Sequence, residues 1–149
     1  MQAQPGFVAR VQESFARQAA MTTLGARLGR VAAGEVDVLM EHGAHLTQQH
    51  GFLHAGIVAC ALDSACGYAA LTLMPHDAAV LTIEFKINLL APARGPSFRF
   101  EGRIAKAGRT ISVAEGRALQ FDVDGGAQVL VATMTATMMT VVGRDGMRA

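Results

Sequence analysis

The sequence predicts a single α+β domain in which a curved antiparallel sheet wraps around one long apolar helix. Residues 57–73 are apolar almost throughout, and Asp63 is the only charged residue among them. Four long segments with strand character come after it, between residues 80 and 142. A helix that is apolar nearly all round must be enclosed, and an antiparallel sheet can enclose it while its other face meets solvent or a partner.

The chain before this helix predicts an amphipathic helix and one strand. Apolar residues recur at helical spacing at positions 7, 11, 15 and 19, with polar residues between them. Glycines at 25, 29 and 34 interrupt the next segment, and residues 34–40 then alternate apolar and charged as a half-exposed strand does. Residues 41–54 form a polar, His-rich loop that leads into the apolar helix.

The segments after the helix predict a meander of strands over residues 80–89, 97–106, 110–122 and 128–142. Their connections are a Pro- and Gly-containing turn at 91–96, a Gly turn at 107–109 and an Asp-Gly hairpin loop at 122–126. The first segment alternates strictly, which would place on one face Thr82, Glu84, Lys86 and Asn88, and on the other Leu81, Ile83, Phe85, Ile87 and Leu89. We expect one domain over residues 1–149, with frayed ends at 1–6 and 143–149.

Composition excludes several classes of protein. A net charge of +1, one Tyr and no Trp argue against a nucleic-acid partner. Cys60 and Cys66 lie inside the apolar helix, so we expect buried thiols in a reducing compartment. The N-terminus lacks the features of a signal peptide, and Asp63 with its polar neighbours argues against a membrane span. A cytoplasmic protein is expected.

Asp63 is the first candidate site residue. An ionised carboxylate in apolar surroundings costs several kcal/mol unless it is paired or hydrogen-bonded, and such groups often have a catalytic use. The alternative is a structural Asp on a helix edge, or one bonded to a neighbouring hydroxyl. His42, His45, His50 and His54 supply metal-ligand types beside it, but their spacing matches no closed zinc pattern. We therefore expect no metal and no cofactor.

Three segments carry a resemblance to a known family. The segment 48–63, Gln-Gln-His-Gly-Phe-Leu-His-Ala-Gly followed by the start of the apolar helix, resembles the signature of the PaaI-type acyl-CoA thioesterases, usually His-Gly-Gly before a helix with an Asp or Glu. The resemblance continues through residues 82–92 and 102–110 and covers nearly all the chain after the first helix. It implies the hotdog fold and hydrolysis of an acyl-CoA or aryl-CoA thioester to the free acid and CoA, where CoA is part of the substrate.

The resemblance also implies roles for individual residues. Asp63, nine residues after His54, matches the catalytic carboxylate, and Gln48 matches a Gln or Asn six residues before the His. The N–H at the second position of the triplet points at the thioester oxygen in this family, and that position is here Ala55 instead of Gly. If the position needs a positive φ, Ala is penalised; if φ is ordinary, its N–H serves equally well.

The sequence does not decide which residue supplies the hydroxyl that the family site contains. Some members place a Ser or Thr one turn after the carboxylate, where this chain has Gly67, and others use a hydroxyl on the following strand, which Thr82 matches. His54 is expected to orient the loop or cap nearby groups more than to act as a base.

The chemistry expected of these residues is thioester hydrolysis. Asp63 would act as general base for water or as nucleophile, and helix N-terminal N–H groups at Ala55 and Gly56 would stabilise the oxyanion. Asp63 lies two turns into the helix and cannot reach its own N-terminus. The resemblance implies a homodimer with composite sites, in which one subunit supplies Gln48, His54 and Ala55 and the other supplies Asp63 and Thr82. A pairing of two such dimers is also expected.

The phosphates of CoA have a candidate binding turn over residues 106–110. Its members are Lys106, Gly108, Arg109 and Thr110, and Arg94 in the preceding turn is a further candidate. Solvated cations beside turns are the alternative. Two other functions stay open: a non-catalytic acyl-CoA-binding protein, and a hotdog dehydratase. The dehydratase would need a His base paired with an acid, and the apolar helix contains no His.

Overall fold

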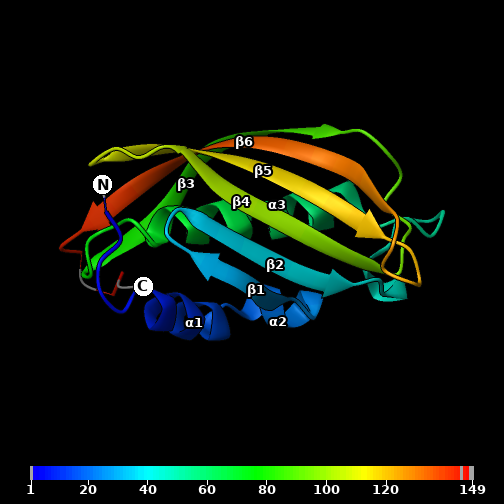
Figure 1. The fold of residues 1–149 in the computed structure, drawn as a ribbon, viewed down its shortest axis with the longest axis horizontal. Helices are drawn as coiled ribbons and strands as arrows, with labels where there is room; N and C mark the ends of the chain where they lie inside the picture. The colour runs from blue at the N-terminus through cyan, green and yellow to red at the C-terminus, as the bar shows by residue number, and fades with distance from the viewer. Residues whose placement is uncertain (1, 145, 148–149) are drawn as a thin grey trace.

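The computed structural model describes residues 2–144 and 146–147. Its elements in chain order are α1 (Phe7–Arg17), α2 (Ala19–Leu24), β1 (Arg27–Ala32), β2 (Glu35–Glu41), the short 3₁₀ turn η1 (Ala44–Leu46), α3 (Ala55–Leu71), β3 (Ala78–Leu89), β4 (Ser97–Lys106), β5 (Ile111–Phe121) and β6 (Gln128–Val142) (Figure 1). Residues 1, 145, 148 and 149, which belong to the ends expected to fray, lie outside the described residues.

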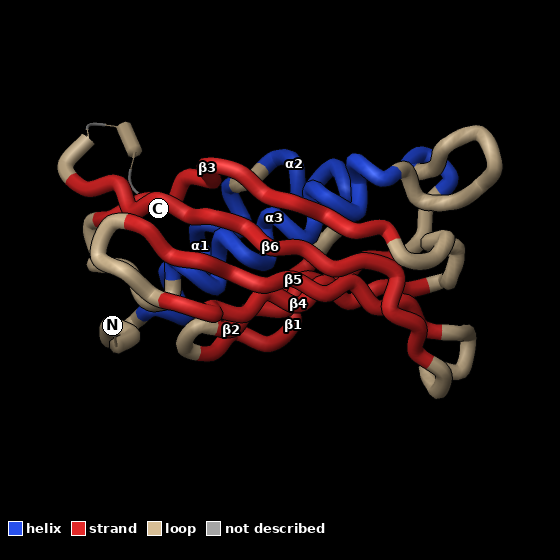
Figure 2. The backbone as a smooth tube through the Cα atoms, turned by 90° about the horizontal axis from the view of Figure 1, so that it is seen from above, coloured by secondary structure: helices blue, strands red, loops and turns tan. Residues whose placement is uncertain are grey.

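One antiparallel sheet in the order β1-β2-β4-β5-β6-β3 curves around α3, with β3 at one edge (Figure 2). This confirms the predicted α+β hotdog arrangement, and the four strands after the helix match their predicted ranges to within two residues. Helix α1 also lies where its periodicity predicts it. None of the helices in the described part of the chain is long and apolar enough to cross a membrane.

The segment between the first helix and residue 34 contains two elements that the sequence pattern did not predict, α2 and β1. Its glycines have specific structural roles instead of simply breaking structure. Gly25 ends α2 in the left-handed conformation at φ 65°, which favours glycine. Gly29 lies within β1, and a Cβ there would come within 3.2 Å of the Leu39 side chain on β2. It therefore permits a close approach between these two strands.

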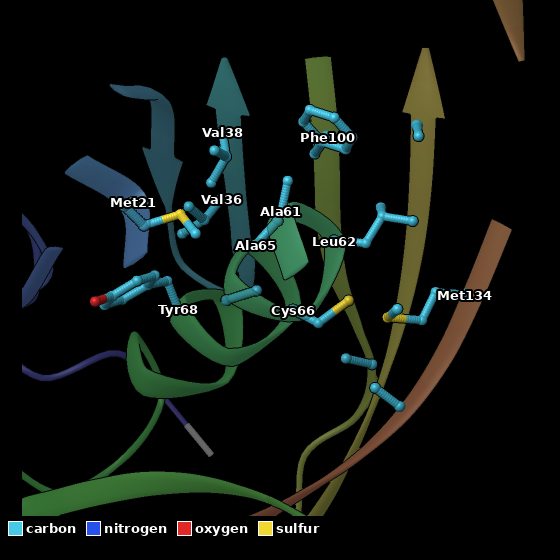
Figure 3. Packing of buried hydrophobic residues seen from close by; sticks show 14 of the residues in the cluster. Met21, Val36, Val38, Ala61, Leu62, Ala65, Cys66, Tyr68, Phe100 and Met134 are labelled. Carbon is cyan, nitrogen blue, oxygen red and sulfur yellow. The ribbon is translucent and has the colours of Figure 1, made fainter. Parts of the chain in front are cut away.

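Glycines also set the contact between α3 and the sheet. A Cβ on Gly102 of β4 would lie 2.3 Å from the backbone carbonyl of Ala65, and one on Gly116 of β5 would meet Leu62 and Cys66 at 3.1 Å. Ala61, Leu62, Ala65 and Cys66 are fully buried there. Figure 3 shows Ala61 and Ala65 on the side of Val36 and Val38, and Leu62 and Cys66 on the side of Met134. The helix therefore packs with its own backbone against the sheet.

A β-bulge in β3 corrects the predicted alternation of that strand. Cross-strand partners share a face, and Thr82 pairs with Met138 while Phe85 pairs with Ala136, both of which are buried on the helix side of β6. Ile83 is the extra residue between them. Thr82 therefore faces α3 together with Phe85, Ile87 and Leu89, and it does not share a face with Glu84, Lys86 and Asn88 as the strict alternation predicted.

Arg10 fastens α1 to the far end of α3. Its side chain is 7% exposed, and its guanidinium donates to the carbonyl oxygens of Leu71, of Met74 at 3.1 Å and of Pro75 at 2.5 Å. These carbonyls lie at and just beyond the C-terminal end of α3, where a helix carries partial negative charge. Burial lowers the pKa of Arg10 from its usual value. This contact fixes the position of α1 beside the candidate site.

Candidate active site

The loop that leads into α3 is closed by short-range hydrogen bonds. Thr47 and Leu53 form an isolated β-bridge, the N–H of Gln48 donates to the Phe52 carbonyl at 2.9 Å, and Gly51 has φ 83° in the turn. The side-chain oxygen of Gln48 accepts from the His50 N–H, so it is turned into its own loop. The ring Nε2 of His42 lies 3.0 Å from the Gly51 carbonyl oxygen. These bonds hold residues 47–54 as one compact unit.

Helix α3 begins at the end of this loop with His54 as its N-cap. The Gly56 N–H donates to His54 Nδ1 at 2.9 Å, so the cap already uses one of the two donors expected at an oxyanion site. The Ala55 N–H has no hydrogen-bond partner among the described residues. No residue other than glycine has a positive φ in the described chain, so Ala55 takes an ordinary backbone conformation. The Ala that replaces the family's usual Gly is therefore unstrained.

Asp63 and Thr82 lie together at the middle of the helix. The Thr82 hydroxyl donates to Asp63 Oδ1 at 2.8 Å and lies 3.4 Å from the sulfur of Met138. The bulge at Ile83 makes this contact possible, because it turns Thr82 towards α3 while the polar residues after it face away. Gly67, the other position where the family can carry a hydroxyl, has no side chain to offer. The structure thus brings Asp63 together with Thr82.

The surroundings of Asp63 favour its protonated form. Burial raises the pKa of Asp63, and the hydrogen bond from Thr82 opposes that shift in part. Burial and the charge of Asp63 raise the pKa of Cys60, and they raise the pKa of Cys66 to about 12. The two thiols are free, and at neutral pH these shifts keep them protonated beside the acid. Asp63 is therefore a more basic carboxylate than an ordinary surface Asp.

Asp63 opens into a cavity of about 340 Å³ between α3, α1 and β3. Its polar lining includes Ser14 and Gln18 from the N-terminal segment and Ser64 and Tyr68 from α3, none of which the sequence pattern indicated. Each is an ordinary residue type in its own element, so only the folded arrangement reveals that they share one cavity. The Ser and Tyr on α3 are four residues apart, a spacing that predicts a shared helix face.

Gln48 and Ala55 border a second cavity, of about 410 Å³, at the beginning of α3. Its other walls are the end of β3 and the turn after it, over residues 89–93. Ala55 and Asp63 are eight residues apart on one helix, which corresponds to about 12 Å along its axis. Within one chain, therefore, the Ala55 N–H and the Asp63 carboxylate belong to separate cavities, as the helix geometry predicted.

The candidate phosphate-binding residues fall at the two ends of β4. Gly108 donates its N–H to Ser112 Oγ at 3.2 Å, and a Cβ on it would lie 2.1 Å from the Ile111 carbonyl oxygen, so the turn requires glycine. Lys106, Arg109 and Thr110 are exposed on this turn. Arg94 lies in the turn before β4, where its backbone N–H donates to the Gln120 side chain at 3.0 Å. The strand between them spans about 30 Å, so Arg94 and Arg109 of one chain do not meet.

Among the residues that the structure describes, no group of three or more His, Cys, Asp or Glu side chains is arranged to hold a metal ion.

The six-stranded antiparallel sheet wrapped around α3 defines the hotdog class, and sequence comparison gives the family. Residues 50–127 match the model of the Thioesterase superfamily, so the chain belongs to that superfamily. A crystal structure of a thioesterase family protein from Silicibacter pomeroyi is 53% identical, with a TM-score of 0.90 over 93% of this chain and 100% of that one.

More distant relatives share the domain. The Escherichia coli medium/long-chain acyl-CoA thioesterase YigI is 29% identical over 100 residues, which are 58% of this chain and 61% of YigI. SSO2140 of Saccharolobus solfataricus, provisionally assigned as an esterase, is 37% identical over 94 residues, and the match spans 64% of its length. The PaaI protein from the phenylacetic acid degradation operon of E. coli has the same fold, with a TM-score of 0.80 at 17% identity over 92% of this chain and 94% of PaaI.

Proposed function

We propose that this protein hydrolyses acyl-CoA thioesters, with Asp63 as the catalytic carboxylate. The observation that carries the proposal is the Asp63–Thr82 pair, a half-buried acid with a raised pKa that faces a cavity of about 340 Å³. Membership of the thioesterase superfamily supports the reaction class, and the relation to YigI supports CoA as the thiol. Asp63 would remove a proton from water or attack the carbonyl carbon itself, with Thr82 orienting the carboxylate.

The oxyanion of the tetrahedral intermediate needs a fixed donor, and the Ala55 N–H is the best candidate. Within the described residues it has no partner, it belongs to the first residue of α3, and it lies at the positive end of the helix dipole. Because the Gly56 N–H already bonds His54, we assign the main role to Ala55 and treat the cap as the feature that holds it in place. Gln48 borders the same cavity, and because the His50 N–H holds its side-chain oxygen, its Nε2 group would be the part that contacts the thioester or the water.

A complete site would then combine two subunits through β3. This edge strand exposes Leu81, Ile83, Phe85 and Leu89, although exposed apolar edges are normally protected. The Asp63 cavity includes residues 79–82 of β3 and the Ala55 cavity includes residues 89–93, so the two lie on either side of Phe85. Antiparallel pairing of two β3 strands about a two-fold axis at Phe85 would place Leu81 opposite the partner's Leu89 and join the two cavities.

The nucleotide end of CoA would lie at the surface of such a pair. Arg109 is our candidate for phosphate contact, because it is exposed and adjoins the Gly108 turn. Lys106 and Thr110 flank it on the same turn, whereas Arg94 would have to come from the partner.

Replacement of Asp63 by Asn tests the proposal. We expect kcat to fall by about 10²- to 10⁴-fold, measured as free-thiol release from a panel of acyl-CoAs. Full hydrolysis by a folded Asp63→Asn protein would refute the assignment of Asp63. Binding of acyl-CoAs by the native protein without any turnover would favour the non-catalytic alternative instead.

Thermal unfolding provides the control for folding. An acid whose pKa is raised in the folded state costs stability as the pH rises through that pKa, because the folded protein then has to ionise a buried group. Asn has no such charge. The Asp63→Asn protein is therefore expected to be at least as stable as the native protein at neutral pH, with the difference shrinking as the pH falls towards 3.8, the ordinary pKa of Asp.

A further inference from the structure

The cavity beside Asp63 has a polar wall at the side of the N-terminal helices. Ser64 Oγ donates to Gln18 Oε1 at 3.2 Å, and Ser14 Oγ lies 3.5 Å from the Tyr68 hydroxyl. Ser64 and Tyr68 are buried, with 8% and 6% of their surface exposed. Figure 3 shows Tyr68 projecting from α3 towards the N-terminal helices, on the opposite side of α3 from Cys66. The wall is therefore built by two segments whose contacts join residues 46 and 54 positions apart in sequence.

These polar groups retain unused hydrogen-bonding capacity. Ser64 occupies the oxygen of the Gln18 amide, and within the described residues the Nε2 group of Gln18 donates no hydrogen bond. The contact between Ser14 and Tyr68 is at the long limit for two hydroxyls, which prefer about 2.7 to 2.8 Å. A ligand hydroxyl placed here could accept a hydrogen bond from Gln18 Nε2. It could also form a hydrogen bond with the Tyr68 hydroxyl, in which either group is the donor.

Space for an acyl group exists between this wall and Asp63. Gly67 lies one turn after Asp63, and a Cβ built on it would meet nothing nearer than Val80 Cγ1 at 4.0 Å. The missing side chain thus leaves part of the cavity open. Asp63 and Tyr68 both line this cavity. They are five residues apart on the helix, about 7.5 Å along its axis and about 140° around it, so an acyl chain of several carbons would be needed to reach from one to the other.

The charges that line the cavity determine which chemical group can end the acyl chain of the substrate. The lining residues include no Lys, Arg or His, and Asp63 is the carboxylate among them. Burial raises the pKa of Tyr68, and the hydrogen bond with Ser14 and the charge of Arg17 oppose that shift in part, but Arg17 is exposed and does not line the cavity. A second carboxylate would therefore be buried near Asp63 without a cation, which is unfavourable.

We propose that this cavity binds the acyl group of the substrate and selects short acyl chains that end in an uncharged hydroxyl, which Gln18 and Tyr68 recognise. The inference rests on the thioesterase function proposed above and adds the substrate class. It makes Gln18 and Tyr68 specificity-determining residues, and it gives the N-terminal helix α1 a part in substrate selection.

Three six-carbon substrates test the inference: hexanoyl-CoA, its ω-hydroxy derivative and adipoyl-CoA, which ends in a carboxylate. We expect kcat/KM to be highest for the ω-hydroxy substrate, and lowest for adipoyl-CoA. Gln18→Leu and Tyr68→Phe should each lower the ratio of kcat/KM for ω-hydroxyhexanoyl-CoA over hexanoyl-CoA by about three- to tenfold, the effect of one neutral hydrogen bond. Gln128→Leu, at an exposed position on β6, is the matched control and should leave the ratio unchanged.

The outcomes separate this inference from the proposed function. Hydrolysis of all three substrates with hexanoyl-CoA preferred, or an unchanged ratio in both variants, would overturn the inference and leave the thioesterase function standing. If no thioester is hydrolysed, the proposed function fails, and calorimetric binding of the same three compounds then decides the inference. Tighter binding of the ω-hydroxy compound that is lost in Gln18→Leu would support it, and equal binding of the three would overturn it.

Discussion

Burial raises the pKa of the candidate catalytic acid Asp63, and Thr82 moderates that shift. Its hydroxyl donates to Asp63 at 2.8 Å, and a donor stabilises the ionised form of a carboxylate. This bond lowers the pKa of Asp63, against the burial that raises it.

Replacement of Thr82 by Val removes that donor at nearly constant volume. The pKa of Asp63 should rise further, so the acid limb of the pH profile of kcat/KM should move to higher pH. The profile of the native protein and the variant on one acyl-CoA measures this shift. Thr133→Val on the other face of the sheet, where the hydroxyl accepts from Asn88, is the control. An acid limb at the same pH in Thr82→Val and the native protein would contradict the proposed role.

The sequence could reveal Asp63 but not its whole environment. A single charge in an apolar helix is visible in the sequence, because burial of that charge needs a reason. Gln18 and Tyr68 are not visible in this way, since a Gln at a helix end and a Tyr in a core are ordinary. An unpaired N–H at the start of the helix was predicted, and the Ala55 N–H has no partner within residues 2–144 and 146–147. The occupation of the Gly56 N–H by His54 depends on a side-chain rotamer that no sequence pattern contains.

At the scale of elements, α1 packs through Val11 and Phe15 and is also held by one buried cation. Arg10 donates to three carbonyl oxygens at and beyond the end of α3. Those of Leu71 and Pro75 also accept the backbone N–H groups of Met74 and Ala78, so the loss of Arg10 leaves the Met74 carbonyl without a donor among the described residues. The helix and the residue after it also carry Ser14 and Gln18 to the cavity, which makes its position relevant to the site.

Arg10→Met should lower the free energy of unfolding by about 3 kcal/mol, because three hydrogen bonds from a charged donor are lost and the Met74 carbonyl is left unpaired. Urea unfolding followed by circular dichroism measures the change as a lower midpoint with an unchanged slope. Arg17→Met is the matched control, since Arg17 is exposed on the same helix and should change stability by less than about 0.5 kcal/mol. Equal effects of the two substitutions would disprove the capping role.

Periodicity predicted most elements because long strands and amphipathic helices repeat their pattern over many residues. Periodicity failed where one extra residue shifts the alternation of side chains between the two faces of a strand. Ile83 adds a residue to β3 and reverses the face of the residues before it, and nothing in an alternating segment marks the position of such a bulge. β1 was missed because Gly25, Gly29 and Gly34 together resemble a loop, while Gly29 in fact serves close packing against Leu39.

At the scale of the whole molecule, the proposed site requires two subunits. Ala55 is the first residue of α3 and comes after a residue in extended conformation at φ −60° and ψ 138°, so a proline is tolerated there and removes the N–H. Ala55→Pro should therefore fold normally and lose about 10²- to 10³-fold in kcat. Ala55→Ser, which keeps the N–H, is its control.

Mixing the Ala55→Pro and Asp63→Asn proteins distinguishes a composite site from a site within one chain. In a mixed dimer one site combines both defects, and the other combines an intact Ala55 with an intact Asp63. After unfolding and refolding an equal mixture, about half of the dimers should be mixed, so about a quarter of the native activity should return. Failure to recover activity when ultracentrifugation detects dimers would place both groups of the site in one chain.

The close contact of α3 with Gly102 and Gly116 also determines where the chemistry can tolerate change. Helix α3 packs against the sheet at two glycines that have no side chain, and Asp63 projects from another side of the helix. A methyl group added at either glycine would displace or rotate α3, and the Asp63 carboxylate would then move away from the Thr82 hydroxyl on β3. The positions of the reacting groups therefore depend on two buried glycines that contact neither substrate nor solvent. Engineering of this protein for new acyl groups should change the cavity wall and leave Gly102 and Gly116 unchanged.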